Sequence, residues 1–109
     1  MESVEQIAFK IIAASGDSFS LLIEAMKLAR EGDFEKAEAK VKEADRFLTE
    51  AHRVQTDLIV KESRGEKMEY STLLIHAQDH LMNAMLAKPF VLEIINLYKK
   101  MAKEGEGRN

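Results

Sequence analysis

The sequence contains no cysteine and no tryptophan, and it has a single proline. Without cysteine the chain forms no disulfide, no thiolate metal site and no cysteine nucleophile. Small secreted domains usually depend on disulfides, so this absence favours the cytoplasm. No apolar run approaches the roughly 18 residues that cross a bilayer. The first ten residues, MESVEQIAFK, also lack the pattern of a signal peptide. We therefore expect a cytoplasmic protein.

The charge balance is close to neutral. The formal net charge is −3, so nothing in the composition favours nucleic acid or an anionic membrane surface as a partner. Apolar residues make up 46% of the chain and charged residues 32%, which is typical of a globular protein. At 109 residues the chain is long enough for one domain. We assign this domain to residues 1–103 and expect a flexible polar tail over residues 104–109.

Helical periodicity dominates the rest of the sequence, and no segment is typical of a strand. Ser3 and Gln6 form a capping-box pattern before a first helix that should end near Gly32. Asp33 is placed to cap a second helix, and Ser71 a third. The second helix carries a seam with steps of three and four residues, typical of a bundle: Phe34, Ala37, Val41, Ala44, Leu48, Ala51, Gln55 and Leu58.

Three positions interrupt this regular pattern. Gly16 lies in the middle of the first helix, which indicates close packing or a bend there. Gln55 is the polar member of the second seam. It either makes a polar contact that fixes the register of assembly or is solvated at the edge of the seam. Pro89 lies inside the third helix, where an interior proline costs about 3 kcal/mol, so we expect a kink or a break near Ala87 and Lys88.

Three long helices with short connections predict an all-α fold, an antiparallel up-down-up three-helix bundle. The one polar cluster on a helix that should mostly be core is the stretch HAQDH. His76 lies three residues before Asp79 and four before His80, so these side chains are neighbours on the helix. Gln78 flanks them.

Three interpretations of this cluster compete. His76, His80 and Asp79 have the spacing of a helical zinc site, although Ala77 replaces the glutamate that a metalloprotease motif requires. One imidazole can instead act as the nucleophile of phosphoryl transfer, because a neutral histidine is abundant at physiological pH. The third interpretation is structural, in a helical scaffold without catalysis. On the residues alone, all three stay open.

Several separated blocks resemble one known family in order and spacing. The chain is similar to the IIA component of the lactose/cellobiose class of the bacterial sugar phosphotransferase system, from about Val4 to Lys100. The blocks that carry the resemblance are IAFKIIAASGDSFSLLIEAM, REGDFEKAEAKVKEA, EAHRVQTDLI, HAQDHLMNAMLAK and INLYKK. The resemblance implies a homotrimer, a bundle of nine helices in total, which carries phosphate between two partner proteins for the uptake of a β-disaccharide.

The same resemblance assigns roles to the residues of HAQDH. The family's phosphorylated histidine corresponds to His76, which would accept phosphate from the general carrier HPr. It would then pass it to a cysteine of the IIB component, and the membrane component IIC is an indirect partner. The family's metal-binding aspartate corresponds to Asp79. Three such carboxylates around a threefold axis repel one another and call for one divalent cation per trimer, with Mg²⁺ the natural choice.

The remaining assignments concern the surroundings of His76. We expect Gln78 or a backbone carbonyl to orient its ring, and we expect His80 to lie nearer the core in a structural role. Two features depart from the family pattern. The stretch GDSFS lacks an arginine that relatives often carry there, and Pro89 stands where a helix-compatible residue is usual.

Overall fold

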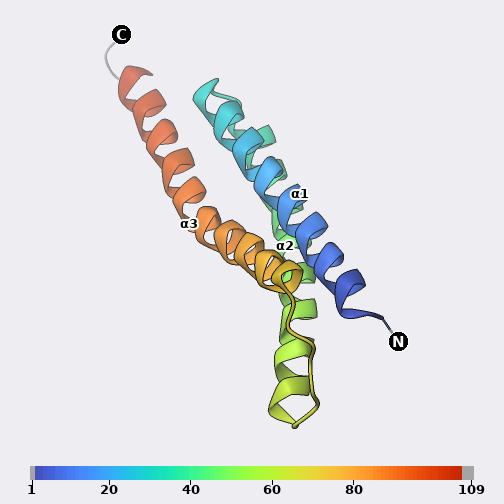
Figure 1. Ribbon diagram of the computed structural model, residues 1–109. Helices are drawn as coiled ribbons and strands as arrows, with labels where there is room; N and C mark the ends of the chain where they lie inside the picture. Colours follow the sequence, from blue (N-terminus) through green and yellow to red (C-terminus); the bar gives the residue numbers. More distant parts are fainter. Residues whose placement is uncertain (1, 107–109) are drawn as a thin grey trace.

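A computed structural model describes residues 2–106 and contains three helices with no strand among those residues. The first helix, α1, spans Val4–Arg30; α2 spans Phe34–Ser63, and α3 spans Thr72–Glu106. The helices run up, down and up again, as the blue, green and orange-red ribbons of Figure 1 show. The predicted all-α antiparallel three-helix bundle is confirmed.

All three helices begin at the caps that the sequence indicates. The backbone N–H of Ser3 donates to Gln6 Oε1 at 2.9 Å, and the N–H of Gln6 donates to Ser3 Oγ at 3.2 Å, which completes the capping box. The side chains of Asp33 and Ser71 accept hydrogen bonds from the backbone three residues further on, at 3.2 and 3.1 Å. Each cap pairs a backbone donor that a helix start leaves free.

The ends of α1 and α2 share one geometry. Gly32 and Gly65 follow the two helices with φ values of 86° and 84°, which glycine adopts without a steric penalty. The N–H of Gly32 donates to the carbonyl of Ala29 at 3.0 Å, and the N–H of Asp33 donates to that of Leu28 at 2.9 Å. These bonds turn the chain sharply enough to lay α2 back along α1.

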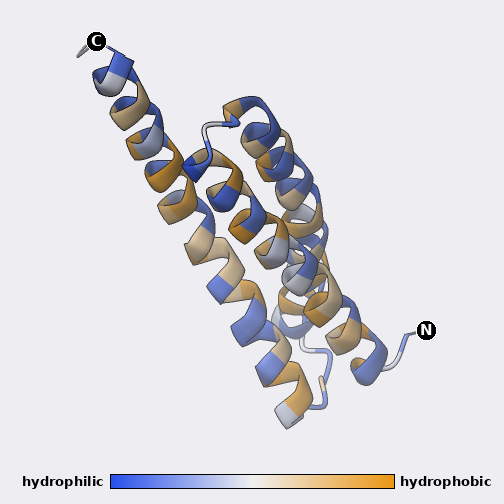
Figure 2. Ribbon diagram, turned by 90° about the horizontal axis from the view of Figure 1, so that it is seen from above, coloured by the Kyte–Doolittle hydropathy of each residue, from blue (hydrophilic) through white to orange (hydrophobic). Residues whose placement is uncertain are grey.

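The core is built around α1, which packs against both other helices, whereas α2 and α3 contact each other much less. The α2 seam is buried as predicted, apart from the half-buried Phe34, and Gln55 is buried with it rather than solvated. Orange apolar and blue polar residues alternate along the helices in Figure 2, as amphipathic packing requires. Small residues on α1 bring the helices close together: Ala8, Ala14, Ser15, Ser18, Ala25 and Ala29 are all buried.

The expectation that no apolar run is long enough to cross a bilayer does not hold for α1. By length and composition, this helix is long and apolar enough to cross a membrane. Its buried face packs in the two core clusters of the bundle. The core helix of a bundle passes the same test. Gly16 causes no bend or close contact within the chain, since α1 is continuous and a Cβ at this position would have no neighbour within 4 Å.

Pro89 does not break α3, which is one helix from Thr72 to Glu106. Figure 1 shows α3 changing direction in its orange middle part, the kind of bend that an interior proline produces. Two ion pairs join the far half of α3 to α2: Lys88 with Asp45, and Lys99 with Glu38. The Lys99 ammonium lowers the pKa of Glu38. The helix continues three residues past the predicted domain end at 103, and residues 107–109 of the expected tail lie outside the described residues.

Two buried serines of α1 give a matched test of the packing. Ser18 Oγ donates to the carbonyl of Ala44 across the α1–α2 interface at 2.9 Å, whereas Ser15 Oγ is buried with no hydrogen-bond partner among the described residues. We expect Ser18→Ala to lower the free energy of unfolding by about 1 kcal/mol. Ser15→Ala should leave it unchanged or raise it. Urea unfolding of both variants checks this, and an equal loss in the two would show that the bond contributes nothing.

Candidate functional site

The site centres on two histidines one turn apart near the start of α3. Ser71 caps this helix, so His76 lies in its second turn and His80 in its third. Both side chains are exposed. Their Nε2 atoms are 3.0 Å apart, and their rings meet edge to face at 87° with centroids 4.4 Å apart. The i, i+4 spacing on a helix brings the two imidazoles into contact.

This contact restricts the protonation of both rings. A hydrogen bond between two Nε2 atoms needs one N–H donor and one lone pair, so the two neutral imidazoles must be opposite tautomers. One ring carries its proton on Nδ1 and presents a lone pair at Nε2, and the other donates from Nε2. The pair thus holds one nucleophilic imidazole nitrogen in a fixed direction at the protein surface.

The predicted position of His80 near the core is wrong. Its side chain is exposed and contacts His76, whereas the core positions of this part of α3 are Ala77, Leu81 and Ala84, all buried. Those three residues fix the helix against α1 and α2, so the histidines have a rigid base. The HxxxH spacing was the sequence signal for the contact, and it did not reveal which face would be covered.

The structure does not bring Gln78 to His76 within one chain. Gln78 is half-buried, and residues two apart on a helix point away from each other. The ring-orienting contact that the chain itself supplies comes from His80. A role for Gln78 toward His76 therefore requires a second subunit.

Asp79 lies in a row of exposed apolar side chains on the outer face of α3. From Ile75 to Phe90 the row follows steps of three and four residues through the carboxylate, and Leu97 extends it after a gap of seven. Its apolar members are between 45% and 62% exposed: Ile75, Met82, Leu86, Phe90 and Leu97. Contiguous exposed apolar surface of this kind marks a protein interface. A carboxylate in the middle of such a row needs a partner of its own once the row is covered.

Within residues 2–106, no three histidine, aspartate or glutamate side chains are grouped closely enough to hold a metal ion. The zinc alternative therefore lacks a three-ligand site in a single chain. The third histidine, His52, lies on α2 and belongs to no such group either. Any metal at Asp79 requires carboxylates from more than one subunit.

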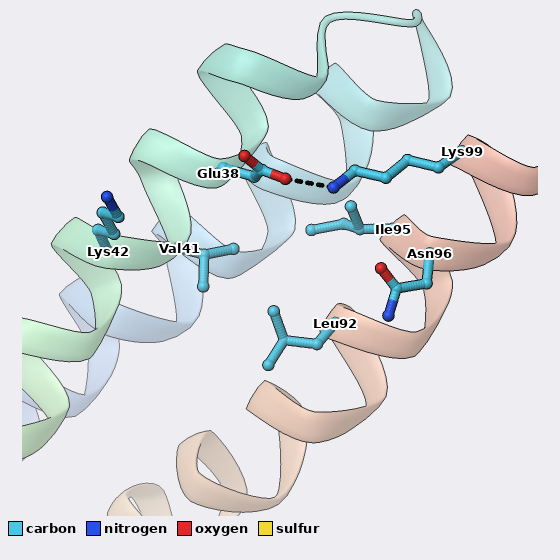
Figure 3. A pocket seen from close by; sticks show the side chains of 7 residues that line it. All are labelled: Glu38, Val41, Lys42, Leu92, Ile95, Asn96 and Lys99. Atoms are coloured by element: carbon cyan, nitrogen blue, oxygen red, sulfur yellow. Dashed lines mark hydrogen bonds and ion pairs between the residues drawn. The ribbon is translucent and has the colours of Figure 1, made fainter. Parts of the chain in front are cut away.

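A pocket of about 340 Å³ lies between α1 and α3 and is lined in part by His80. A second pocket, of about 250 Å³, lies between α2 and the far half of α3 (Figure 3). The second has an apolar lining of Val41, Leu92 and Ile95, with the Glu38–Lys99 ion pair at one side. No histidine is among its lining residues.

The family described as "PTS system, Lactose/Cellobiose specific IIA subunit" matches residues 6–99. The chain belongs to this family, and the resemblance identified from the sequence is confirmed.

Relatives of known sequence and structure agree with this assignment. The chain is 47% identical to the lichenan-specific phosphotransferase enzyme IIA component of Bacillus subtilis, with 94% of each chain covered. It is similar to the crystal structure of the cellobiose-specific enzyme IIA from Bacillus anthracis, with 47% identity, 94% of each chain covered and a TM-score of 0.90. It also resembles the solution structure of a IIA(Chitobiose)–HPr complex from Escherichia coli, with 40% identity, 94% and 99% coverage and a TM-score of 0.81.

The tautomer assignment is open to direct measurement. We expect the ¹⁵N shifts of the imidazole nitrogens at pH 8 to show one of His76 and His80 with its proton on Nδ1 and the other with its proton on Nε2. In His80→Phe, which keeps an aromatic ring without a nitrogen, the His76 signals should change toward those of a mixture of tautomers. Identical tautomers in the wild-type pair would rule out the direct hydrogen bond.

Proposed function

We propose that the protein is a cytoplasmic phosphoryl carrier of a sugar phosphotransferase system, with His76 as the residue that carries the phosphate. The observation that supports this most strongly is the exposed Nε2 of His76, fixed by His80 at 3.0 Å on a chain of the lactose/cellobiose IIA family. The donor is phosphorylated HPr, in keeping with the IIA(Chitobiose)–HPr complex among the similar structures. The acceptor is the cysteine of a IIB component, which serves the membrane component IIC.

The residues of this chain account for the steps of the transfer. With the shared proton on His80 Nε2, His76 Nε2 carries the lone pair, and this lone pair attacks phosphorus once the hydrogen bond to His80 opens. The N–P bond to His76 forms as the bond to the donor imidazole breaks, and the electron pair returns to the donor nitrogen. Phosphoryl transfer of this kind depends mainly on alignment and electrostatic support.

We further infer that three copies associate through the apolar row of α3, with Asp79 on the threefold axis. Three carboxylates would converge there, and two of them at about 4 Å repel by about 4 kcal/mol at an effective dielectric of 20. One Mg²⁺ per trimer would neutralise them, because its preferred ligands are carboxylate oxygens and water. One carboxylate per chain in an otherwise apolar row is a donor set that fits this ion. The ion's part is to support assembly, and no step of the transfer passes through it.

Phosphorylation provides the first test. Incubation with phosphoenolpyruvate, the general enzyme of the system and HPr should place one acid-labile phosphate on the wild-type protein. His76→Gln should lose it completely, because glutamine has no nucleophilic nitrogen. His52→Gln alters the one histidine outside the pair, which is also exposed, and this variant should keep the phosphate. Unlabelled wild-type protein in the presence of active donors would favour the alternative, a helical scaffold without group transfer.

The assembly is tested by Asp79→Leu. We expect this variant to lose bound Mg²⁺ yet remain trimeric, and to resist heat at least as well as wild type, since apolar packing replaces a cluster of like charges. Asp57→Leu, at an exposed position of α2, should keep the metal. Metal analysis and sedimentation measure both properties. A wild-type trimer that contains no metal and is indifferent to chelator would contradict the role of Asp79.

A further inference from the structure

The pocket beside the histidines lies between α1 and α3 and is called here the α1–α3 pocket. Its lining comes from one stretch of each helix: Ser15, Gly16, Phe19 and Ser20 of α1 with His80 and Asn83 of α3. His80 thus lines the pocket and also contacts His76 through Nε2 at 3.0 Å. The pocket therefore reaches the imidazole that contacts the His76 nitrogen.

The polar groups of this lining suit an anion. Two serine hydroxyls, one imidazole and one carboxamide can all donate hydrogen bonds, and no acidic side chain is among the six residues. Hydrogen bonds from neutral donors to a charged acceptor are shorter and stronger than those between neutral groups. A phosphoryl group carries oxygens that need such donors on several sides.

Ser15 adds a separate observation. Its side chain is 1% exposed and lines the pocket, and its Oγ has no hydrogen-bond partner among the described residues. A buried hydroxyl without a partner costs about 1 to 3 kcal/mol, so such groups are rare unless they serve a ligand or a bound molecule. Its Oγ is covered at the floor of the pocket, so the side chain must rotate about χ1 to donate to an oxygen that enters it.

Gly16 keeps the pocket open. A Cβ at this position would meet no atom within 4 Å, so no packing contact requires a glycine there. A helix-interior glycine costs about 1 kcal/mol relative to alanine. This cost is understandable if the space above Gly16 must remain accessible to a ligand.

We propose that the α1–α3 pocket is an oxyanion site that holds the phosphoryl oxygens of phosphorylated His76, with Ser15, Ser20 and Asn83 as donors beside His80. This inference rests on the proposed function. When the bond between His76 Nε2 and phosphorus forms, the phosphoryl group comes between the two imidazoles, and its oxygens turn toward the pocket. The donors stabilise the phosphorylated protein relative to phosphorylated HPr.

The equilibrium between phosphorylated HPr and this protein measures that stabilisation. Asn83→Ala and Ser20→Ala should each shift it about tenfold toward HPr, the effect of losing one hydrogen bond to a charged group. The ³¹P signal of phosphorylated His76 should move in both variants. Asn96→Ala, at another exposed asparagine of α3, serves as the control and should change neither. Unchanged equilibrium and ³¹P shift in both variants, with wild type fully phosphorylated, would overturn this inference and leave the carrier function intact.

Filling the pocket gives a second readout that does not remove a donor. Gly16→Leu should fold normally, since its Cβ has room, but should shift the equilibrium toward HPr at least tenfold. Ala39→Leu, at an exposed position of α2, should not. If Gly16→Leu instead dissociates the assembly with phosphorylation of the monomer unaffected, the pocket is a contact between subunits, and the proposal fails.

The source of the anion is distinguished with inorganic phosphate and the His76→Gln variant. Shifts of the Ser20 and Asn83 resonances on titration would show that the pocket binds free phosphate as well as the covalent group. Shifts only on phosphorylation of wild-type protein would confine it to the group on His76. If the Ser20 and Asn83 resonances shift in neither experiment, the proposed oxyanion site is wrong. Absence of phosphorylation in wild type, by contrast, would refute the carrier function itself.

Discussion

The bundle depends on the packing of α1 against both of its neighbours. Because α2 and α3 contact each other only weakly, the two core clusters of the protein are held together by residues of this one helix. Its buried alanines and serines let two other backbones come close on adjacent sides, and Ser18 ties it to α2 by a buried hydrogen bond.

This arrangement leaves the outer face of α3 without a cover inside one chain. One side of α3 packs inside the chain, and its opposite side carries a row of large apolar residues. The same helix presents His76 and His80 to solvent near its start. Assembly and phosphoryl transfer would therefore use adjacent faces of a single helix. Asp79 lies within the apolar row of α3, and His76, three residues earlier, lies beside that row.

The chemistry at His76 needs little more than direction. A second imidazole at hydrogen-bond distance fixes the attacking nitrogen, and the buried residues Ala77, Leu81 and Ala84 hold the helix beneath both rings. Such a site can remain shallow, since a carrier must give its phosphate away as readily as it takes it. The neighbouring α1–α3 pocket supplies neutral donors on the side of His80, which suits a group that is charged only while the protein is loaded.

The sequence by itself determined the elements of the fold. The caps at Ser3, Asp33 and Ser71, the glycine after α1 and the seam of α2 all reflect interactions within a few residues, and the structure confirms each of them. Local rules of hydrogen bonding and periodicity are sufficient for such features.

Only the tertiary structure decided which faces are covered. It placed His80 at the surface against His76, buried Gln55 and kept α3 continuous through Pro89. It also gathered Ser15 and Ser20 of α1 with Asn83 of α3 around one pocket. These outcomes depend on how two helices distant in sequence rotate against each other. Periodicity gives the faces of each helix, but the angle between helices is set by the volumes of all the side chains between them.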